Sequence, residues 1–388
     1  MLNFEFSEEH KMIQNTVREF ANKEVKPLAE EFDRSPEFLT KEFLKLFRKM
    51  GDLGFYGLMF PEEYDGIGDG LDILGASIVH RELGKVSSGT SSSYMPQIIV
   101  GGVIMSHFCS EDQKKKYLPD LAAGKTIVCL GVTEPNAGSD VAAIQTDFYL
   151  DGDEYVLNGS KQFITNAPVA DLFYILAKDK EDGEHCGFLI EKGTKGLAVG
   201  PHLDKMGHRA SPTSEVFMDD CRIPKENIIG EKGKGVTQSL MGIEVERIMC
   251  GSENVGIAEG ALAEAIKYSK ERISFGKPIC EHQAVQGLLA EMATGVKTGE
   301  AMLYYAIWDF LKNKDVPKKF PSLATSIVKY YTGQMVERVT SHAVQVHGGY
   351  GYIKEYPVER FMRDSKLLQI GGGTSQIQEM LIARNLLA

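Results

Sequence analysis

The sequence has none of the short motifs that most often mark nucleotide-binding or metal-binding proteins. No GxGxxG follows a strand-like run and no GxxxxGK[ST] occurs, so a dinucleotide fingerprint and a P-loop are both missing. The GEKGKG run at 230–235 lacks the Lys-Ser/Thr pair of a phosphate loop. No HExxH occurs, and His342 and His347 are five residues apart, the wrong spacing for two ligands on one helical face. We therefore expect no metal centre.

The chain also lacks paired cysteines, long apolar runs and a basic character. No run of about 18 uninterrupted apolar residues occurs, so we expect no membrane span. The N-terminal MLNFEFSEEHKMIQ resembles neither a signal peptide nor an Arg-rich transit segment. A net charge of −11 argues against nucleic acid or an anionic membrane surface as the main partner. Six scattered cysteines without a CxxC pair favour reduced thiols, and we expect a cytoplasmic protein: Cys109, Cys129, Cys186, Cys221, Cys250 and Cys280.

The periodicity of apolar residues divides the chain into three parts. With 388 residues, 43% of them hydrophobic, the chain can bury a large core in two or three domains. Between about 125 and 225, strand-like runs alternate with turn signals such as Asp151-Gly152 and Asn158-Gly159. We expect an α+β, mainly α chain with an N-terminal helical domain (1–124), a central β domain (125–230) and a C-terminal helical bundle (231–388). Helices are expected over 7–32, 37–54, 71–85, 94–122, 234–271, 281–312, 321–346 and 375–387.

Four glycine-rich or mixed stretches carry the candidate chemistry. GVTEPNAGSD (131–140) can present backbone N–H groups and hydroxyls to a ligand, and NGSKQFITNA (158–167) is expected to follow a hairpin turn. ERISFGKPICEHQAVQ (271–286) combines residues suited to a phosphate and an aromatic ring. The fourth stretch, 345–378, contains two glycine clusters and ends in QIGGGTSQIQ. Each stretch taken singly is also compatible with an ordinary turn or helix connection.

In their joint order these stretches resemble the acyl-CoA dehydrogenase family over essentially the whole chain. VTEPNAGSD, NGSKQFITN, RISFGKPICEHQ, QVHGGYGY and GTSQIQ occur in the family's order and at its spacing. The resemblance implies an FAD-dependent homotetramer whose C-terminal domain is a four-helix bundle. It also implies an acyl-CoA substrate, removal of an α proton by a carboxylate, hydride transfer to flavin N5, and electron-transfer flavoprotein as the acceptor.

The resemblance further implies which residues contact FAD. The first group, at the flavin, is Leu130, Val132, Thr133, Gly138, Ser139, Phe163 and Thr165. The second group, at the ADP part and supplied in this family by a neighbouring subunit, is Arg272, Ser274, Phe275, Gln283, Gln345 and Gly349. Thr374 and Gln376 match positions at the ribityl-pyrophosphate region, where a helix N-terminus independently favours phosphate.

The catalytic base is expected on a helix rather than in the C-terminal loop. Many family members carry aromatic-Glu-Gly-Thr where this chain has 371–374, so Gly372 stands in the glutamate's place and keeps only its N–H for the thioester carbonyl. By resemblance to isovaleryl-type and long-chain-type members, the base is Glu246 in MGIEVERIMCG. Without the family, such an acid is usually just solvated. Glu244 lies roughly 200° away around the helix, and Arg247 matches a family arginine that contacts CoA.

The substrate is the least constrained expectation. Ser91 stands where glutaryl-type members carry an arginine, which disfavours a dicarboxylic acyl group. Room beside Gly371–Gly373 suggests a branched-chain or alicyclic acyl-CoA, for example of the cyclohexane-carboxyl type. A straight-chain long acyl-CoA, an acyl-CoA oxidase and a base-less acyl-CoA-binding relative remain alternatives. The expected substrate contacts are Ser139, Ser91, Arg247 and Gly373.

Overall fold

The N-terminal third of the computed structural model is helical. The structure describes residues 5–35, 39–313 and 322–387. α1 begins after Ser7, whose hydroxyl accepts a hydrogen bond from the His10 N–H at 3.2 Å. The helices are α1 (Glu8–Phe20), α2 (Ala29–Arg34), α3 (Leu39–Asp52), α4 (Ile73–Gly84), α5 (Ser88–Pro96), α6 (Ser106–Phe108) and α7 (Glu111–Ala122), with π-helical η1 (Ala21–Val25) and η6 (Gln97–Met105).

The helix expected over 94–122 is wrong in its bounds. The helical segment starts at Ser88, because the Ser87 hydroxyl caps it by accepting from the Thr90 N–H at 3.4 Å. It ends at Phe108, and a new helix starts after Ser110, which forms a reciprocal capping box with Gln113. Polar capping residues thus set ends that the apolar period alone did not indicate.

The central domain is one mixed sheet with the strand order β6-β7-β3-β2-β4-β5-β8, in which β1 pairs in parallel with β4. A hairpin turn joins β2 to β3 where Asp151-Gly152 predicted one, but its two turn residues are Gly152 and Asp153, because Asp151 still pairs with Glu154. The turn expected at Asn158-Gly159 is wrong, because both residues lie inside β3 at a shift of register against β7. The strands are β1 (Val128–Gly131), β2 (Asp147–Asp151), β3 (Glu154–Thr165), β4 (Leu172–Asp179), β5 (His185–Glu191), β6 (Leu197–Val199), β7 (Thr213–Pro224) and β8 (Ile228–Ile229).

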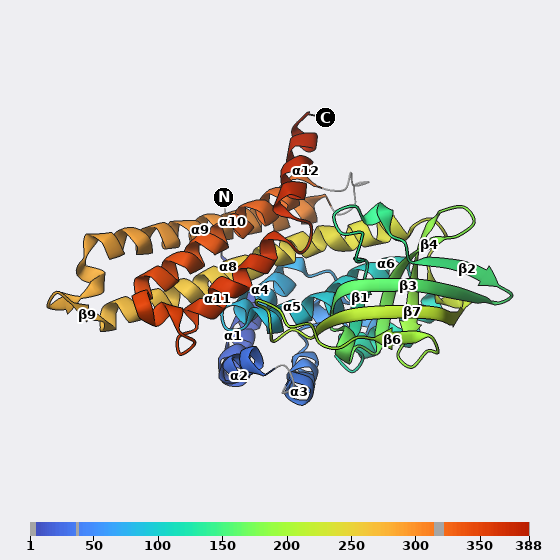
Figure 1. The fold of residues 1–388 in the computed structure, drawn as a ribbon, viewed down its shortest axis with the longest axis horizontal. Coiled ribbons are helices and arrows are strands. Elements are labelled where there is room, and N and C mark those ends of the chain that lie inside the picture. Colours follow the sequence, from blue (N-terminus) through green and yellow to red (C-terminus); the bar gives the residue numbers. More distant parts are fainter. Residues whose placement is uncertain (1–4, 36–38, 314–321, 388) are drawn as a thin grey trace.

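The C-terminal domain is built on three long helices, α8 (Gly235–Glu271), α9 (Gln283–Lys312) and α10 (Leu323–His347). α8 has 37 residues and is therefore about 55 Å long. It runs from the β domain to the hairpin of β9 (Ile273–Ser274) and β10 (Lys277–Pro278) at the far end of the bundle (Figure 1). α12 (Ser375–Leu387) packs on α10, and α11 (Val358–Ser365) is a helix that the sequence did not predict.

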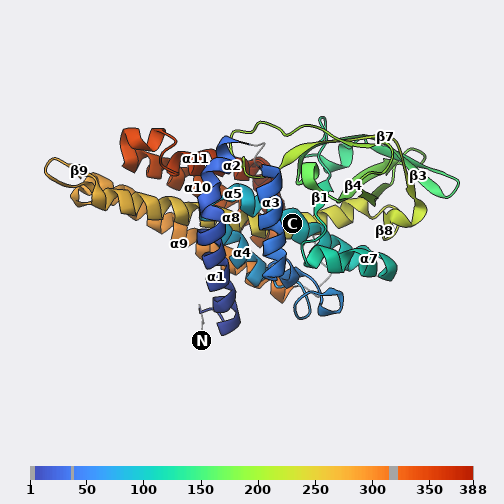
Figure 2. The same ribbon diagram turned by 90° about the horizontal axis from the view of Figure 1, so that it is seen from below.

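Seen from below, the N-terminal helices lie against the middle of this bundle (Figure 2). α4 packs along α8, and the C-terminal helices share one hydrophobic core with the N-terminal helices. The fold is therefore a helical N-terminal domain, a central β domain and a C-terminal helical domain, as expected. No helix in the described part of the chain is long and apolar enough to cross a membrane.

Candidate active site

The structure brings Glu246 next to Gly372. Glu246 lies on α8, and Gly372 lies in the turn that precedes α12. A Cβ placed on Gly372 would lie 3.6 Å from Glu246 Oε1 and 3.7 Å from Glu246 Cδ. The carboxylate on α8 therefore occupies the space beside the position from which a loop glutamate would project.

The backbone of the Gly371–Thr374 turn requires glycine. Gly372 and Gly373 have φ values of +65° and +88°, a region that side chains disfavour. A Cβ on Gly372 would also lie 3.1 Å from the Cys250 thiol, one helical turn after Glu246. The Gly371 N–H donates to the Leu367 carbonyl at 2.9 Å, whereas the Gly372 N–H has no acceptor among the described residues. A backbone donor without a partner thus lies beside a carboxylate.

Glu246 is half-buried, and no described residue forms a hydrogen bond with its carboxylate. Burial raises the pKa of the Glu246 carboxyl above its ordinary value, and the positive charges of Lys329 and Arg247 offset part of that rise. Such a group is a stronger base than a solvated carboxylate and is free to accept a proton from a ligand.

Glu244, the other acid of this segment, is held in the protein interior. Its carboxylate accepts hydrogen bonds from the Ser322 N–H at 2.8 Å and from the Thr325 hydroxyl at 2.5 Å, and it pairs with Arg247 Nη1 at 3.0 Å. Glu244 is therefore committed to joining α8 to the start of α10. Arg247 is itself buried, with its Nε left without a partner in the described structure. Its contact with CoA stays a prediction.

Residues expected at the flavin gather around a bulge in β3. Phe163 has a φ of +61° and a side chain that is 65% exposed, which is unusual for a bulky aromatic residue inside a strand. The Gln162 N–H donates to the Thr133 carbonyl at 2.8 Å, which places the 131–140 loop beside Phe163. The fully buried Lys161 fixes the same loop through a 2.7 Å ion pair with Glu134. The other members of this group are half-buried Leu130 and Thr165, buried Val132, and exposed Gly138 and Ser139.

Residues expected at the ADP part gather at the far end of the bundle. A pocket of about 400 Å³ is lined by Arg272, Ser274 and Gly349, together with aromatic residues that include Tyr350. The Arg272 guanidinium lies 5.6 Å from the centre of the Tyr350 ring. A Cβ on Gly349 would meet no atom within 4 Å, so the backbone there is open to a ligand. The pocket offers a cation, hydroxyls and aromatic faces, which fit a phosphate next to a planar ring.

Phe275 lies at the tip of the β9–β10 hairpin beside this pocket. Its side chain is 93% exposed and its φ is +50°. Gln283 and Gln345 are also exposed at this end of the bundle. An exposed aromatic residue on a strained turn is typical of a surface that another molecule covers.

The two groups of expected FAD contacts lie at opposite ends of the folded molecule. Figures 1 and 2 both show β9 at one end of the bundle and the β domain at the other. Along α8 alone, the 25 residues from Glu246 to Glu271 span about 38 Å. The two groups of one chain therefore do not form one compact site. Thr374 lies near Glu246, where its hydroxyl caps α12 by accepting from the Ile377 N–H at 3.2 Å, and Gln376 is exposed in the first turn of α12.

Ser91 is placed in the core. Its hydroxyl lies 2.6 Å from His80 Nδ1 and 2.9 Å from the His80 carbonyl, and the residue is fully buried. A substrate could contact Ser91 only if these bonds opened, and this role stays a prediction. Gly373, by contrast, is half-buried in the turn beside Glu246.

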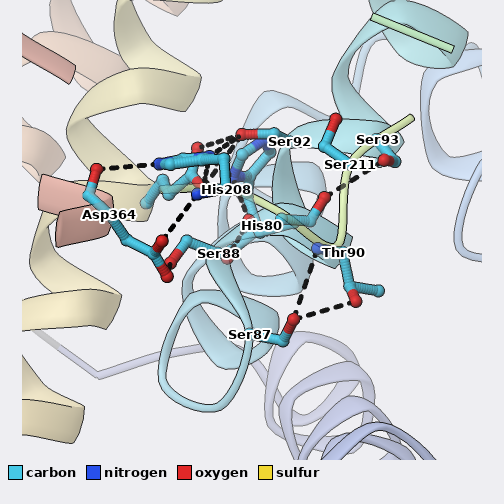
Figure 3. A network of polar contacts seen from close by, with 12 residues as sticks. His80, Ser87, Ser88, Thr90, Ser92, Ser93, His208, Ser211 and Asp364 are labelled. Atoms are coloured by element: carbon cyan, nitrogen blue, oxygen red, sulfur yellow. Dashed lines mark hydrogen bonds and ion pairs between the residues drawn. The ribbon is translucent and has the colours of Figure 1, made fainter. Parts of the chain in front are cut away.

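A buried polar network joins α4, α5 and α11 with the loop that carries His208 (Figure 3), and Ser91 of α5 and Glu253 of α8 bond to it. The Ser92 hydroxyl lies 2.8 Å from His208 Nδ1 and 3.1 Å from a Glu253 carboxyl oxygen. Asp364 accepts from the His208 N–H at 2.6 Å. Burial raises the pKa of Glu253 well above its ordinary value and lowers the pKa of His80 to about 3. This environment thus favours the neutral forms of Glu253 and His80.

Three residues of the site were missed by the sequence reasoning. Cys250 lies against Gly372, and the side chains of Lys329 and Gln378 hold the carbonyls of the glycine turn. The available signal was a lysine within the apolar helical run SIVKYY. A lysine at a buried position of a helix needs a specific partner.

Comparison with known proteins identifies the family. Models of the acyl-CoA dehydrogenase N-terminal, middle and C-terminal domains match residues 7–125, 129–221 and 233–387. The chain is 37% identical over 388 residues to the cyclohexane-1-carbonyl-CoA dehydrogenase of Geobacter metallireducens, covering 99% of each chain. It is 39% identical over 388 residues to the caffeyl-CoA reductase-Etf complex subunit CarC of Acetobacterium woodii, covering 98% of this chain and 99% of that one.

A solved structure agrees with these matches. The acyl-CoA dehydrogenase of Bacillus anthracis complexed with FAD superposes with a TM-score of 0.93 at 32% identity, covering 100% of this chain and 68% of that one. Its similarity extends over all three domains of the fold described above. The chain belongs to the acyl-CoA dehydrogenase family of oxidoreductases, which act on CH–CH bonds.

Proposed function

We propose that this acyl-CoA dehydrogenase removes two hydrogens from the α and β carbons of a branched-chain or alicyclic acyl-CoA, with Glu246 as the base. The observation that carries the proposal is the 3.6 Å separation between Glu246 Oε1 and the Cβ position of Gly372. It supports a base on α8 whose carboxylate lies where a glutamate at position 372 of the loop would project. Glu246 is also the only carboxylate of its segment that is free to act, because Glu244 is committed to Arg247 and Thr325.

The proposed proton transfer follows from the environment of Glu246. An α C–H beside a thioester is a weak acid, so its removal needs a strong base and a polarised carbonyl. The raised pKa of Glu246 supports the first requirement. The Gly372 N–H, without a described acceptor, supports the second as a donor to the thioester oxygen. Glu246 takes the proton and holds it on its carboxyl group, while the donor stabilises negative charge on the oxygen.

FAD is the cofactor of this family, and the residues of this chain fit it. The exposed, strained Phe163 and the adjacent Thr133 loop suit a flavin ring, and the Arg272 pocket suits a phosphate with a planar base. FAD held by these residues would supply the acceptor for the hydride of the β carbon. The distance between the two groups within one chain supports a homotetramer in which a neighbouring subunit supplies Arg272, Ser274 and Phe275.

The proposed acyl group rests on the lack of side chains in the turn. Gly371, Gly372 and Gly373 leave space beside Glu246 that a bulky or cyclic acyl group can use. The similarity to the Geobacter cyclohexane-1-carbonyl-CoA dehydrogenase supports an alicyclic substrate. The Acetobacterium relative, a subunit of an Etf complex, supports electron-transfer flavoprotein as the acceptor. A cytoplasmic location is supported by six free thiols and the acidic charge.

Anaerobic reduction of the bound flavin tests the proposal. The protein should lose its visible absorption with cyclohexane-carboxyl-CoA and branched acyl-CoA esters faster than with straight-chain esters of equal carbon number. Faster reduction by straight chains would overturn the substrate class. No reduction by any ester would overturn the dehydrogenase function and favour a base-less binding protein. Rapid reoxidation by oxygen would indicate an oxidase.

A further inference from the structure

The glycine turn is held from two sides by buried donors. Lys329, on α10, is 1% exposed and its ammonium group donates to the Gly373 carbonyl. Gln378, on α12, is fully buried, and its Nε2 lies 3.1 Å from the Gly373 carbonyl and 3.4 Å from the Gly372 carbonyl. Both side chains thus hold the peptide units Gly372–Gly373 and Gly373–Thr374, which directly follow the unit that carries the unpaired Gly372 N–H.

The turn also has hydrogen bonds that involve neither Lys329 nor Gln378. Its backbone already has the Gly371 N–H bonded to Leu367, and Thr374 caps α12. Burying an amide or an ammonium group is costly unless the group is hydrogen-bonded, and here both groups donate to the Gly373 carbonyl. A carbonyl shares a rigid plane only with the N–H of the next residue, so these bonds fix the planes of the Gly372–Gly373 and Gly373–Thr374 peptide bonds. The Gly372 N–H lies in the preceding unit, whose rotation relative to the fixed plane is limited to the φ and ψ angles of Gly372.

Lys329 also acts through its charge. It forms no ion pair with a described carboxylate. Its bond to the Gly373 carbonyl places the ammonium group one residue from Gly372, whose Cβ position lies 3.6 Å from Glu246 Oε1. Burial lowers the pKa of Lys329, and its neighbours Cys250 and Glu246 oppose that shift. The charged or titratable groups that act on Glu246 are Lys329 from α10 and Arg247 and Cys250 from its own helix, and the Gly371–Thr374 turn carries none. The ammonium group stabilises the Glu246 carboxylate without occupying its lone pairs.

We propose that Lys329 and Gln378 are positioning residues: both aim the Gly372 N–H at the thioester oxygen, and Lys329 in addition keeps Glu246 in its carboxylate form. The inference rests on the proposed function, since it assigns helpers to Glu246 and Gly372. The two residues share the role of donor, but only Lys329 carries a charge. Variants of the two therefore separate the effect of the donor from the effect of the charge.

The first experiment compares the pH dependence of kcat/KM. The acid limb is the part of this profile where kcat/KM falls as the pH is lowered. In Lys329→Met the loss of the positive charge raises the pKa of Glu246 further, so the acid limb should move to higher pH by about one unit. In Gln378→Met kcat should fall while the acid limb stays in place, and Lys329→Arg should restore the limb. Lys205→Met is the control, because Lys205 is a half-buried lysine that also donates to a carbonyl, that of Ser211, but lies in a loop of the β domain. It should leave the limb unchanged.

The second experiment needs no turnover. In a Glu246→Gln background with FAD bound, calorimetry compares an acyl-CoA thioester with its thioether analogue, which lacks the carbonyl. The thioester should bind about tenfold more tightly, the value of one good hydrogen bond. Adding Lys329→Met or Gln378→Met should reduce this preference to nearly none. An unchanged preference and an unmoved acid limb would overturn the positioning role. Loss of flavin reduction in the wild-type protein would instead overturn the proposed function.

Discussion

Glu246 and Gly372 form a pair in which the acid and the backbone donor come from different segments. Replacing Glu246 by Gln removes the base but keeps the shape of the side chain. We expect Glu246→Gln to keep FAD and fold while flavin reduction slows roughly 10²- to 10⁴-fold. Stopped-flow absorbance measures this rate, and retained turnover would remove Glu246 from its role.

The pH dependence of the wild-type protein follows from the same residue. Burial raises the pKa of Glu246 above the ordinary 4.5. A base must be deprotonated, so kcat/KM should fall as the pH drops through this raised pKa. Initial rates in buffers of constant ionic strength measure the limb. A limb at or below the value of a solvated glutamate would contradict the assigned environment.

Glycine at 372 is required both by conformation and by space. An alanine there would adopt a φ of +65° and bring its Cβ to 3.1 Å from the Cys250 thiol. We expect Gly372→Ala to destabilise the fold by about 1–3 kcal/mol and to slow turnover, because the donor moves.

Gly371→Ala is the matched control for this change. A Cβ on Gly371 would meet only Leu367, at 3.7 Å and beyond. Urea unfolding of the two variants should therefore show a midpoint shift for residue 372 and little for residue 371. Equal shifts would mean that the turn is not sterically constrained at Gly372.

At the scale of helices, the network around Glu253 holds α4, α5 and α8 together through neutral groups. Because the pKa of Glu253 is raised well above its ordinary value, the folded protein keeps a proton that the unfolded chain releases above about pH 4.5. Stability from this group is thus complete at low pH and is lost as the pH rises. Above about pH 7 the histidines, whose pKa values are lowered, are neutral in both states.

Glu253→Gln should remove this dependence. Between pH 7 and 9 the wild type should lose up to about 1.4 kcal/mol per pH unit relative to the variant, the cost of one proton. Urea unfolding at several pH values measures the difference. Parallel curves for the two proteins would show that Glu253 is ionised in the folded state.

At the scale of the whole molecule, the distance between the two ends of α8 has a consequence for assembly. If Arg272 and Ser274 serve the flavin of a neighbouring subunit, a subunit with both changed to Ala can still use its own Glu246. A Glu246→Gln subunit can still lend its Arg272. Each variant alone should be inactive, and their co-expressed mixture should regain activity, because some sites combine the intact halves. A mixture as inactive as its parents would show that Arg272 acts within its own chain.

The sequence itself predicted most of the fold. Apolar periodicity placed the long helices α8, α9 and α10 within about two residues of their ends, and turn chemistry placed the β2–β3 hairpin within one residue of its turn at Gly152-Asp153. The order of the domains along the chain, helical, then β, then helical, followed from these elements. The prediction failed where a local signal has two uses: Asn158-Gly159 suits a hairpin turn and also a bulge, and the long pairing of β3 with β7 selected the bulge. Ser87 and Ser110 carry helix-capping signals in the sequence, and these caps rather than the apolar period set the helix starts.

For the site, the sequence determined which residue types are available, and the tertiary structure decided which of them meet. The glycine run at 371–373 indicates a turn, and at Gly372 and Gly373 a positive φ disfavours any side chain because it is a property of the local backbone. Whether Glu244 or Glu246 is free depends on Ser322 and Thr325, about 80 residues away, and the lysine that acts on Glu246 comes from α10. Hydrogen bonds and charges act over a few ångströms in space, so contacts between distant segments are fixed only when the helices pack.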